Sequence, residues 1–180
     1  MNIKKTANLL LNFAIKRLAE ICGLLIFAAG SLLLIALLTY SPEDPNFIFP
    51  ENTDIKNLLG FEGSFISDLF FQSVGLISYL ISFTLILTGI NIFKLKGLFL
   101  FIENIFFTIL YCMLGTLFFN YFYVDAFTLY INGNGGFVGK YLNQTFLKSL
   151  IQIHETTSYY VLIFLIFSLF LISINFNLIK

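Results

Sequence analysis

Three places in the sequence carry residue types that take part in chemistry in other proteins: a glycine-rich segment ending in lysine, a carboxylate within an apolar stretch, and a lone histidine. The first, Gly135-Gly136-Phe137-Val138-Gly139-Lys140, has the look of a phosphate-binding loop. That loop requires a glycine five residues before Gly139, and a Ser or Thr after the lysine to bind Mg²⁺. Asn134 and Tyr141 occupy those positions. The spacing therefore excludes a nucleotide site and favours a glycine-rich turn.

The carboxylate is Glu103, and an acidic residue inside a membrane is by default a functional candidate. A proton or ion relay would need further acids, histidines or arginines deep in other spans, and the apolar stretches contain none. We interpret Glu103 as a carboxylate near a helix start, reaching the surface beside Lys94 or Lys96. The histidine, His154, has only the adjacent Glu155 as a metal co-ligand. We predict no catalytic residue, no cofactor and no metal.

The composition places the chain in a membrane. Hydrophobic residues make up 58% of it and charged residues 11%, whereas charged residues are about 25% of an average soluble domain. Such a chain cannot cover its apolar surface with polar side chains, so we predict an all-α polytopic membrane protein. Its two cysteines, Cys22 and Cys112, lie in apolar stretches and indicate no disulfide framework.

Four apolar stretches are long enough to cross a membrane, because a helix needs about 20 apolar residues to span a hydrocarbon layer of roughly 30 Å. They are residues 21–40, 69–93, 98–119 and 158–178. The first ends at Tyr40-Ser41-Pro42-Glu43-Asp44-Pro45, where a proline in a helix interior would cost about 3 kcal/mol. Tyr40 suits the boundary between lipid and water, and Glu43 and Asp44 are expected in water. The hexapeptide therefore marks a membrane surface.

Residues 1–20 form a basic segment ahead of the first span, and residues 3–18 have a mildly amphipathic pattern that favours an interfacial helix. A cleavable signal peptide is the competing interpretation. The apolar run, however, exceeds the usual length of about 7 to 15 residues and ends at Pro42 and Glu43 instead of at small residues. We expect a retained helix, followed by a four-helix membrane domain over residues 21–179.

Basic residues predict the orientation. When both termini and the short connection at 94–97 lie on one side, seven basic residues gather there and three on the other. The two sets are Lys4, Lys5, Lys16, Arg17, Lys94, Lys96 and Lys180 against Lys56, Lys140 and Lys148. The positive-inside rule then places both termini in the cytoplasm and the loops 41–68 and 120–157 outside. Spans two and three are expected to form a tight helical hairpin.

The two outer loops differ in character. In residues 41–68, Gly60 and Gly63 lie among apolar residues and predict a compact, ordered turn on the membrane surface. In residues 120–157, a dense turn signal at 132–136 precedes apolar residues at helical spacing. This second pattern predicts an interfacial or re-entrant helix before the fourth span.

Small residues within the spans indicate faces where helices approach closely in lipid. The candidates are Gly23, Ala28 and Gly30 in the first span and Ser78 and Ser82 in the second. These residues would pack either within the chain or against another copy of it. The sequence leaves both open, and we favour packing within the chain.

Taken in order along the chain, several of these residues form a family pattern. They are Tyr40, Ser41, Pro42, Asp44 and Pro45 after the first span, Asn57, Gly60, Gly63, Ser67, Asp68 and Gly75 leading into the second, and Gly135, Gly136 and Gly139 before the fourth. Over about residues 17–178, the chain resembles the N-terminal four-helix membrane domain of FtsK/SpoIIIE-type DNA translocases.

The resemblance implies a membrane-anchoring and assembly domain at the division septum of the bacterial inner membrane, acting in cell division and chromosome segregation. The ATP-driven motor would lie outside these residues, which would not bind nucleic acid directly. The implied partners are the lipid bilayer, further copies of the chain (a hexamer if the motor sets the number), and division-site membrane proteins. The alternative is a small polytopic transporter or channel subunit. That function needs polar residues converging mid-membrane, and the spans offer mainly Ser, Thr, Asn91 and Glu103.

Overall fold

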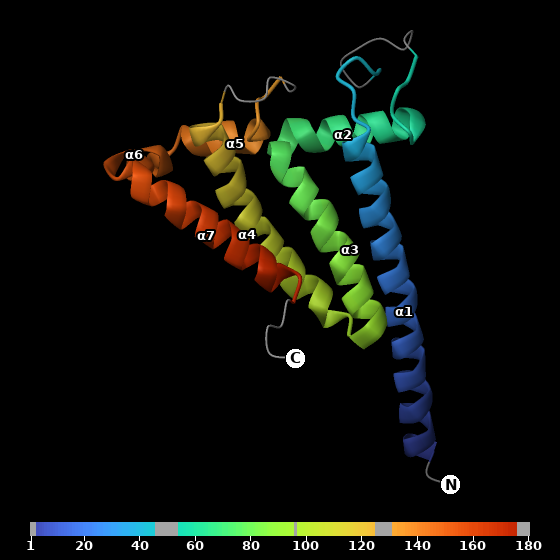
Figure 1. The fold of residues 1–180 in the computed structure, drawn as a ribbon. Helices are drawn as coiled ribbons and strands as arrows, with labels where there is room; N and C mark the ends of the chain where they lie inside the picture. The colour runs from blue at the N-terminus through green and yellow to red at the C-terminus, as the bar shows by residue number, and fades with distance from the viewer. Residues whose placement is uncertain (1–2, 46–53, 96, 125–130, 176–180) are drawn as a thin grey trace.

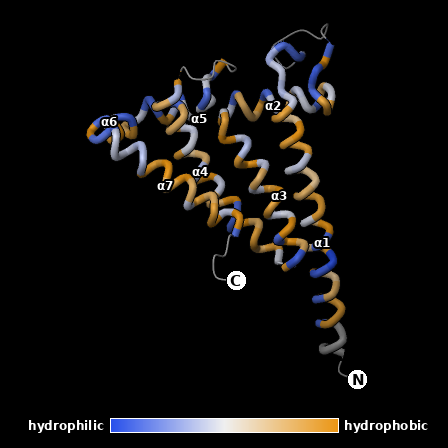
Figure 2. The backbone as a smooth tube through the Cα atoms, viewed as in Figure 1, coloured by the Kyte–Doolittle hydropathy of each residue, from blue (hydrophilic) through white to orange (hydrophobic). Residues whose placement is uncertain are grey.

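The computed structural model describes residues 3–45, 54–95, 97–124 and 131–175. Within these ranges every regular element is a helix (Figure 1), as expected in lipid, where a helix satisfies its own backbone hydrogen bonds. Four segments are long and apolar enough to cross a membrane: Asn8–Leu38, Gly60–Leu95, Phe99–Phe122 and Glu155–Ser173. Hydrophobic residues follow these segments, and hydrophilic residues gather at their connections (Figure 2). The predicted all-helical class with four spans is confirmed.

The first helix, α1, runs without a break from Ile3–Leu38. The prediction of a separate interfacial helix over residues 3–18 is therefore wrong, because residues 3–20 continue into the first span without a break. The end of α1 also differs from the prediction, because the helix stops at Leu38 rather than Tyr40. Pro42 lies four residues further on, where it has no N–H for the carbonyl of Leu38 and its ring would clash with that carbonyl in a longer helix.

The second predicted span is divided by a sharp bend. Helix α2 (Gly60–Val74) lies across the ends of α1 and α3, a single 3₁₀ turn η1 (Gly75–Ile77) follows, and α3 (Ser78–Leu95) then runs alongside α1 (Figure 1). The bend occurs at Gly75, whose φ is 63°. Residues 69–74 thus belong to the transverse helix. The turn predicted around Gly60 and Gly63 is present only up to Gly60, whose N–H donates to the carbonyl of Asn57 at 2.9 Å; Gly63 lies inside helix α2, which begins at Gly60.

The second half of the chain repeats this arrangement. Helix α4 (Phe99–Phe122) crosses back, α5 (Gly136–Asn143) and α6 (Phe146–Ile153) lie at the same end as α2, and α7 (Glu155–Ser173) returns (Figure 1). One interfacial helix was predicted over residues 137–153, and the structure has two. The helix is interrupted before α6, where the hydroxyl of Thr145 accepts a hydrogen bond from the backbone N–H of Leu147 and so caps α6. The last residues of the predicted fourth span, 176–178, lie outside the described residues.

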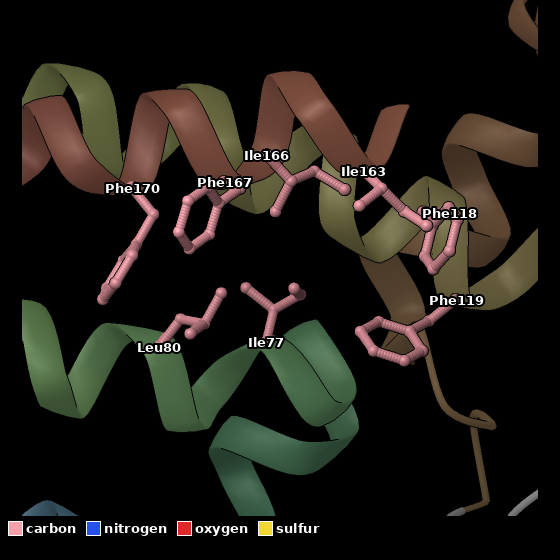
Figure 3. Close-up of a pocket in the computed structure, with 8 residues that line it drawn as sticks. All are labelled: Ile77, Leu80, Phe118, Phe119, Ile163, Ile166, Phe167 and Phe170. Carbon is pink, nitrogen blue, oxygen red and sulfur yellow. The ribbon is translucent and has the colours of Figure 1, made fainter. Parts of the chain in front are cut away.

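The crossing helices pack as two pairs rather than as an even bundle. Helix α1 packs mainly against α3 and helix α4 mainly against α7. Between the pairs, on the side where α3 faces α7, lies an apolar cavity of about 290 Å³ (Figure 3). Its lining comes from η1, α3, α4 and α7: Ile77, Leu80, Phe118, Phe119, Ile163, Ile166, Phe167 and Phe170. Apolar side chains from both pairs thus face this cavity.

Helix α1 meets α3 at glycine backbone. A Cβ on Gly23 would lie 2.7 Å from the backbone nitrogen of Phe93, and one on Gly30 would lie 2.8 Å from that of Ile86. Both predicted packing glycines thus serve contact within the chain. Ala28 does not, because its side chain is exposed; at 100° per residue it lies about 200° around the helix from Gly30.

Candidate functional site

The hexapeptide after α1 forms a joint between α1 and α2, which we call the outer joint: residues 40–45 with Asn57, Gly63, Ser64 and Asp68. The phenol of Tyr40 donates to a carboxylate oxygen of Asp68 on α2, 3.1 Å away, and its ring packs edge-on against Phe71 at 4.9 Å between centroids. The Ser64 hydroxyl donates to the carbonyl of Pro45 at 3.0 Å. The hexapeptide therefore attaches α2 across the end of α1.

Asp44 is the centre of the outer joint and is fully buried, with 0% of its surface exposed. Its two carboxylate oxygens accept the backbone N–H groups of Lys56 and Asn57, each at 2.9 Å. The expectation that Asp44 lies in water is wrong. A carboxylate is tolerated in this position because both oxygens receive hydrogen bonds that replace water.

The side chain of Asn57 completes the end of α1. Its amide nitrogen donates to the carbonyl oxygens of Ala36, at 2.9 Å, and Thr39, at 3.3 Å. The last carbonyls of a helix have no partner within the helix, so this contact satisfies groups that the helix end leaves open. Its amide oxygen accepts from the backbone N–H of Leu59 at 3.0 Å. A Cβ on Gly63 would lie 2.2 Å from that same oxygen, which explains the glycine at this position.

Glu43, beside Asp44, behaves as expected of an acid in water. It is exposed and forms an ion pair with Lys56. The hydrogen bond from Lys56, together with its charge, lowers the pKa of the Glu43 carboxyl below its usual value. Two neighbouring acids in one motif thus have opposite environments, and only Asp44 is part of the buried joint.

The glycines before the fourth span form a second contact, which we call the glycine junction: Gly75, Asn134, Gly135, Gly136 and Gly139. The backbone N–H of Leu76 donates to the carbonyl of Asn134 at 2.9 Å. A Cβ on Gly75 would lie 1.9 Å from that carbonyl oxygen, and one on Gly136 would lie 2.6 Å from the backbone of Ser73. Both glycines also have positive φ, a conformation that side chains disfavour.

The other two glycines of the junction bring α5 onto α4. A Cβ on Gly135 or Gly139 would lie 2.3 Å or 2.4 Å from the carbonyl oxygen of Thr116. The start of α5 therefore lies in close backbone contact with both η1 and α4. This contact joins the two helix pairs at this end of the molecule. Lys140, the lysine of the phosphate-loop pattern, instead donates to Asn132 and to the carbonyl of Ile131, each at 3.3 Å.

A third cluster joins the pairs from the middle of α3 and α4 towards the opposite end, and we call it the inner polar cluster: Thr84, Thr88 and Asn91 of α3, Asn104 and Tyr111 of α4, Ser173 of α7, and Ile174 and Asn175 directly after it. Asn104 is 1% exposed; its amide donates to Thr88 at 2.8 Å and accepts from Asn175 at 2.7 Å. Asn91 donates to the carbonyl of Ile174 at 2.9 Å. Thr84 lies 2.9 Å from the Tyr111 hydroxyl.

This cluster is not apparent from the sequence, in which the spans offer mainly Ser, Thr, Asn91 and Glu103 as polar residues. Asn104, an amide one residue from Glu103 in a nearly charge-free helix, was the available signal. Glu103 itself is exposed on the other face. Ser78 and Ser82 are buried, and each hydroxyl donates to the backbone carbonyl three residues earlier, that of Gly75 or Tyr79, rather than to another helix.

The geometry of these clusters offers structural connection rather than reactive chemistry. Within the described residues, no group of three His, Cys, Asp or Glu side chains could hold a metal ion, and His154 is exposed between α6 and α7. Each buried polar side chain named above contacts another polar group of the fold. The fold and its three clusters define a multi-pass membrane domain with four crossing segments and transverse helices at one end.

Comparison with known proteins identifies the family. Residues 15–180 match the family model of the 4TM region of DNA translocase FtsK/SpoIIIE, and the chain belongs to this family. The DNA translocase FtsK of Rhizobium meliloti (strain 1021) is 33% identical over 69 residues, which cover 38% of this chain and 8% of that protein. No solved structure matches the chain. The chain is a multi-pass inner-membrane domain of this family, distinct from the motor.

Proposed function

We propose that this chain is the membrane-anchoring and assembly domain of a septal DNA translocase that acts in cell division and chromosome segregation, with the ATP-driven motor outside these residues. Family membership supports a membrane domain of such a translocase. The three clusters support anchoring, because they join helices and contain no reactive constellation among the described residues. Further copies of the chain and division-site membrane proteins are the proposed partners.

The observation that carries the proposal is the attachment of the end of α7. Ile174 and Asn175, directly after this helix, are hydrogen-bonded to Asn91 of α3 and Asn104 of α4 respectively. A force applied to the chain beyond α7 would therefore pass into two other membrane helices. Together with the packing of α7 against α4, this connection supports an anchoring role, because the load would be shared among several membrane helices.

The proposed orientation puts α2, α5 and α6 outside and both termini in the cytoplasm, on the side where a DNA motor works. It rests on the distribution of basic residues. Alkaline phosphatase fused after Asn52 should then be active and phosphatase fused after Lys96 inactive. The reverse pattern would refute the orientation.

A septum experiment tests the function. The 180-residue chain, fused to a fluorescent protein and expressed in dividing cells, should concentrate at the division site. Uniform membrane fluorescence would refute a role in septal assembly. A variant with the outer joint disrupted by Asp44→Ala, expressed to the same level, shows whether localisation depends on the folded outer surface.

A transporter or channel subunit is the competing class, and the inner polar cluster is the feature it would use. The nearest cavity, lined by Thr84, Thr88, Asn104 and Thr108 among others, has a volume of about 40 Å³, enough for only a few water molecules at about 10–15 Å³ each. A cavity of this size fits a packed joint better than a pathway. Ion flux through proteoliposomes, abolished by Asn104→Leu, would establish the competing function.

A further inference from the structure

A second apolar cavity opens beneath α2, and we call it the α2 groove. It has a volume of about 530 Å³. Its walls come from α1, the segment leading into α2, α2 itself and α3: Ala29, Leu32, Leu33, Ala36, Leu59, Glu62, Gly63, Ile66, Phe70 and Leu85. Leu32 is 52% exposed and Ile66 is 41% exposed, so the groove opens sideways, on the surface that would face lipid.

The dimensions of the α2 groove favour one kind of occupant. Its wall on α1 extends from Ala29 to Ala36, which is about 10 Å along a helix. Helix α2 lies across the end of α1 (Figure 1), and its residues Gly63, Ile66 and Phe70 line the groove at that end. A crossing helix of a partner or of a second copy, which needs roughly 30 Å of uninterrupted length, would collide with α2. A lipid chain, which begins at the membrane surface and ends mid-bilayer, does not.

The charge at the rim selects the headgroup. Glu62 is the one ionisable side chain among the lining residues, and it is exposed in the first turn of α2. The two ion pairs found in the described residues involve other acids, Glu20 and Glu43. The carboxylate therefore lies where the transverse helix meets the headgroup layer, above an apolar groove, and is available to a cation.

We propose that the α2 groove binds one phospholipid with an ethanolamine headgroup: an acyl chain lies against Leu32 and Ile66, and the ammonium group pairs with Glu62. Ethanolamine fits because its ammonium donates hydrogen bonds to a carboxylate in addition to its charge. A phosphoglycerol lipid of the same chain length has a net negative charge and is repelled. The proposal requires only the folded chain in a bilayer, so it is independent of the anchoring function.

Native mass spectrometry tests the proposal. The 180-residue protein is purified in detergent, exposed to equal amounts of phosphatidylethanolamine and phosphatidylglycerol with identical acyl chains, and the retained lipids are counted. We expect a preference for ethanolamine that falls about two- to fivefold in Glu62→Gln, the range that an exposed ion pair supplies. Glu155→Gln is the matched control, because Glu155 is likewise an exposed acid in the first turn of a helix.

A second variant tests the groove itself. Ile66→Trp fills it from α2, and Leu32→Trp fills it from α1 if the first variant does not fold. Either folded variant should retain less of both lipids. The proposal is refuted by equal retention of the two lipids in the wild type, by equal effects of the Glu62 and Glu155 substitutions, or by unchanged lipid retention in a folded, filled variant. A dimer that Ile66→Trp dissociates would also refute it, by assigning the groove to a second copy.

Discussion

The buried carboxylate of Asp44 allows a sharp test of the outer joint. Asp44→Ala removes the acceptor of two backbone N–H groups, those of Lys56 and Asn57, each 2.9 Å from it. A buried donor left without a partner costs about 1–3 kcal/mol. The N–H of Asn57 is buried and that of Lys56 only partly so, so we expect a loss of about 2–4 kcal/mol in the free energy of unfolding.

The neighbouring acid supplies the control. Glu43→Ala removes only an exposed ion pair, and we expect no measurable change in stability. Asp44→Asn keeps one acceptor oxygen and turns an amide N–H group towards the other donor, so its effect should lie between those of the two alanine variants. The three variants differ by only a few atoms, at two adjacent positions.

Two measurements check this prediction. Steric trapping in bicelles gives the free energy of unfolding, and hydrogen exchange reports the protection of the Lys56 and Asn57 amides. In Asp44→Ala the exchange of these amides should accelerate at least about tenfold, the factor that corresponds to 1.4 kcal/mol. If Asp44→Ala and Glu43→Ala lower stability equally, or if the two amides keep their protection, the carboxylate does not hold the joint.

Three further predictions concern the other contacts. Gly75→Ala combines a positive φ with a Cβ 1.9 Å from a carbonyl oxygen, and it should lower the free energy of unfolding by at least about 3 kcal/mol. Gly133→Ala has a positive φ but open space, and it should lower that free energy by about 1–2 kcal/mol in the same assay. Asn104→Leu removes two hydrogen bonds to other segments, those with Thr88 and Asn175, and should lower the free energy of unfolding by about 1–3 kcal/mol. Thr108→Val removes a hydroxyl that donates to a carbonyl of its own helix, and it should change that free energy by less than about 0.5 kcal/mol. A ¹³C NMR titration should place the pKa of Glu43 below its usual value, because the pair with Lys56 favours the charged carboxylate; since that pair is exposed, its loss as pH falls through the lowered pKa should change stability by no measurable amount.

Each of these has a result that contradicts it. Equal costs for the two glycine substitutions would mean that the junction relaxes around a methyl group. A cost for Thr108→Val equal to that of Asn104→Leu would remove the evidence that the inner polar cluster holds the helices together. An unshifted Glu43, or one whose pKa stays low when its lysine partner is replaced by methionine, would show that the ion pair does not form in solution.

Motifs in the sequence located much of the candidate site without revealing its geometry. The family pattern named Asp44, Gly63, Asp68 and Gly75, and all four are buried at contacts between elements. Their contacts join segments distant in the chain: Tyr40 bonds Asp68, 28 residues away, and Asn57 bonds Ala36, 21 residues away. Residue types alone suggest that such positions contact other parts of the chain. Which residue each one contacts depends on the path of the folded chain between them.

The same limit explains the errors. Asp44 was assigned to water because an isolated carboxylate prefers it, yet two backbone N–H groups replace that water. The transverse helix α2 was taken for a turn, because glycines are typical of turns and Gly60 also suits the left-handed residue that opens a helix. Asn104 was overlooked because a single amide barely changes the hydropathy of its span.

Sequence alone determined that this chain is a helical membrane protein with four crossings, and it indicated the family, because hydropathy and helix length are properties of short consecutive segments. Tertiary structure decided which residues hold the helices together: the outer joint, the glycine junction and the inner polar cluster. In lipid, apolar side chains gain little by leaving one apolar surface for another, so the choice of neighbour depends on close backbone contact and on hydrogen bonds between distant segments. Those depend on distances that exist only once the chain has folded.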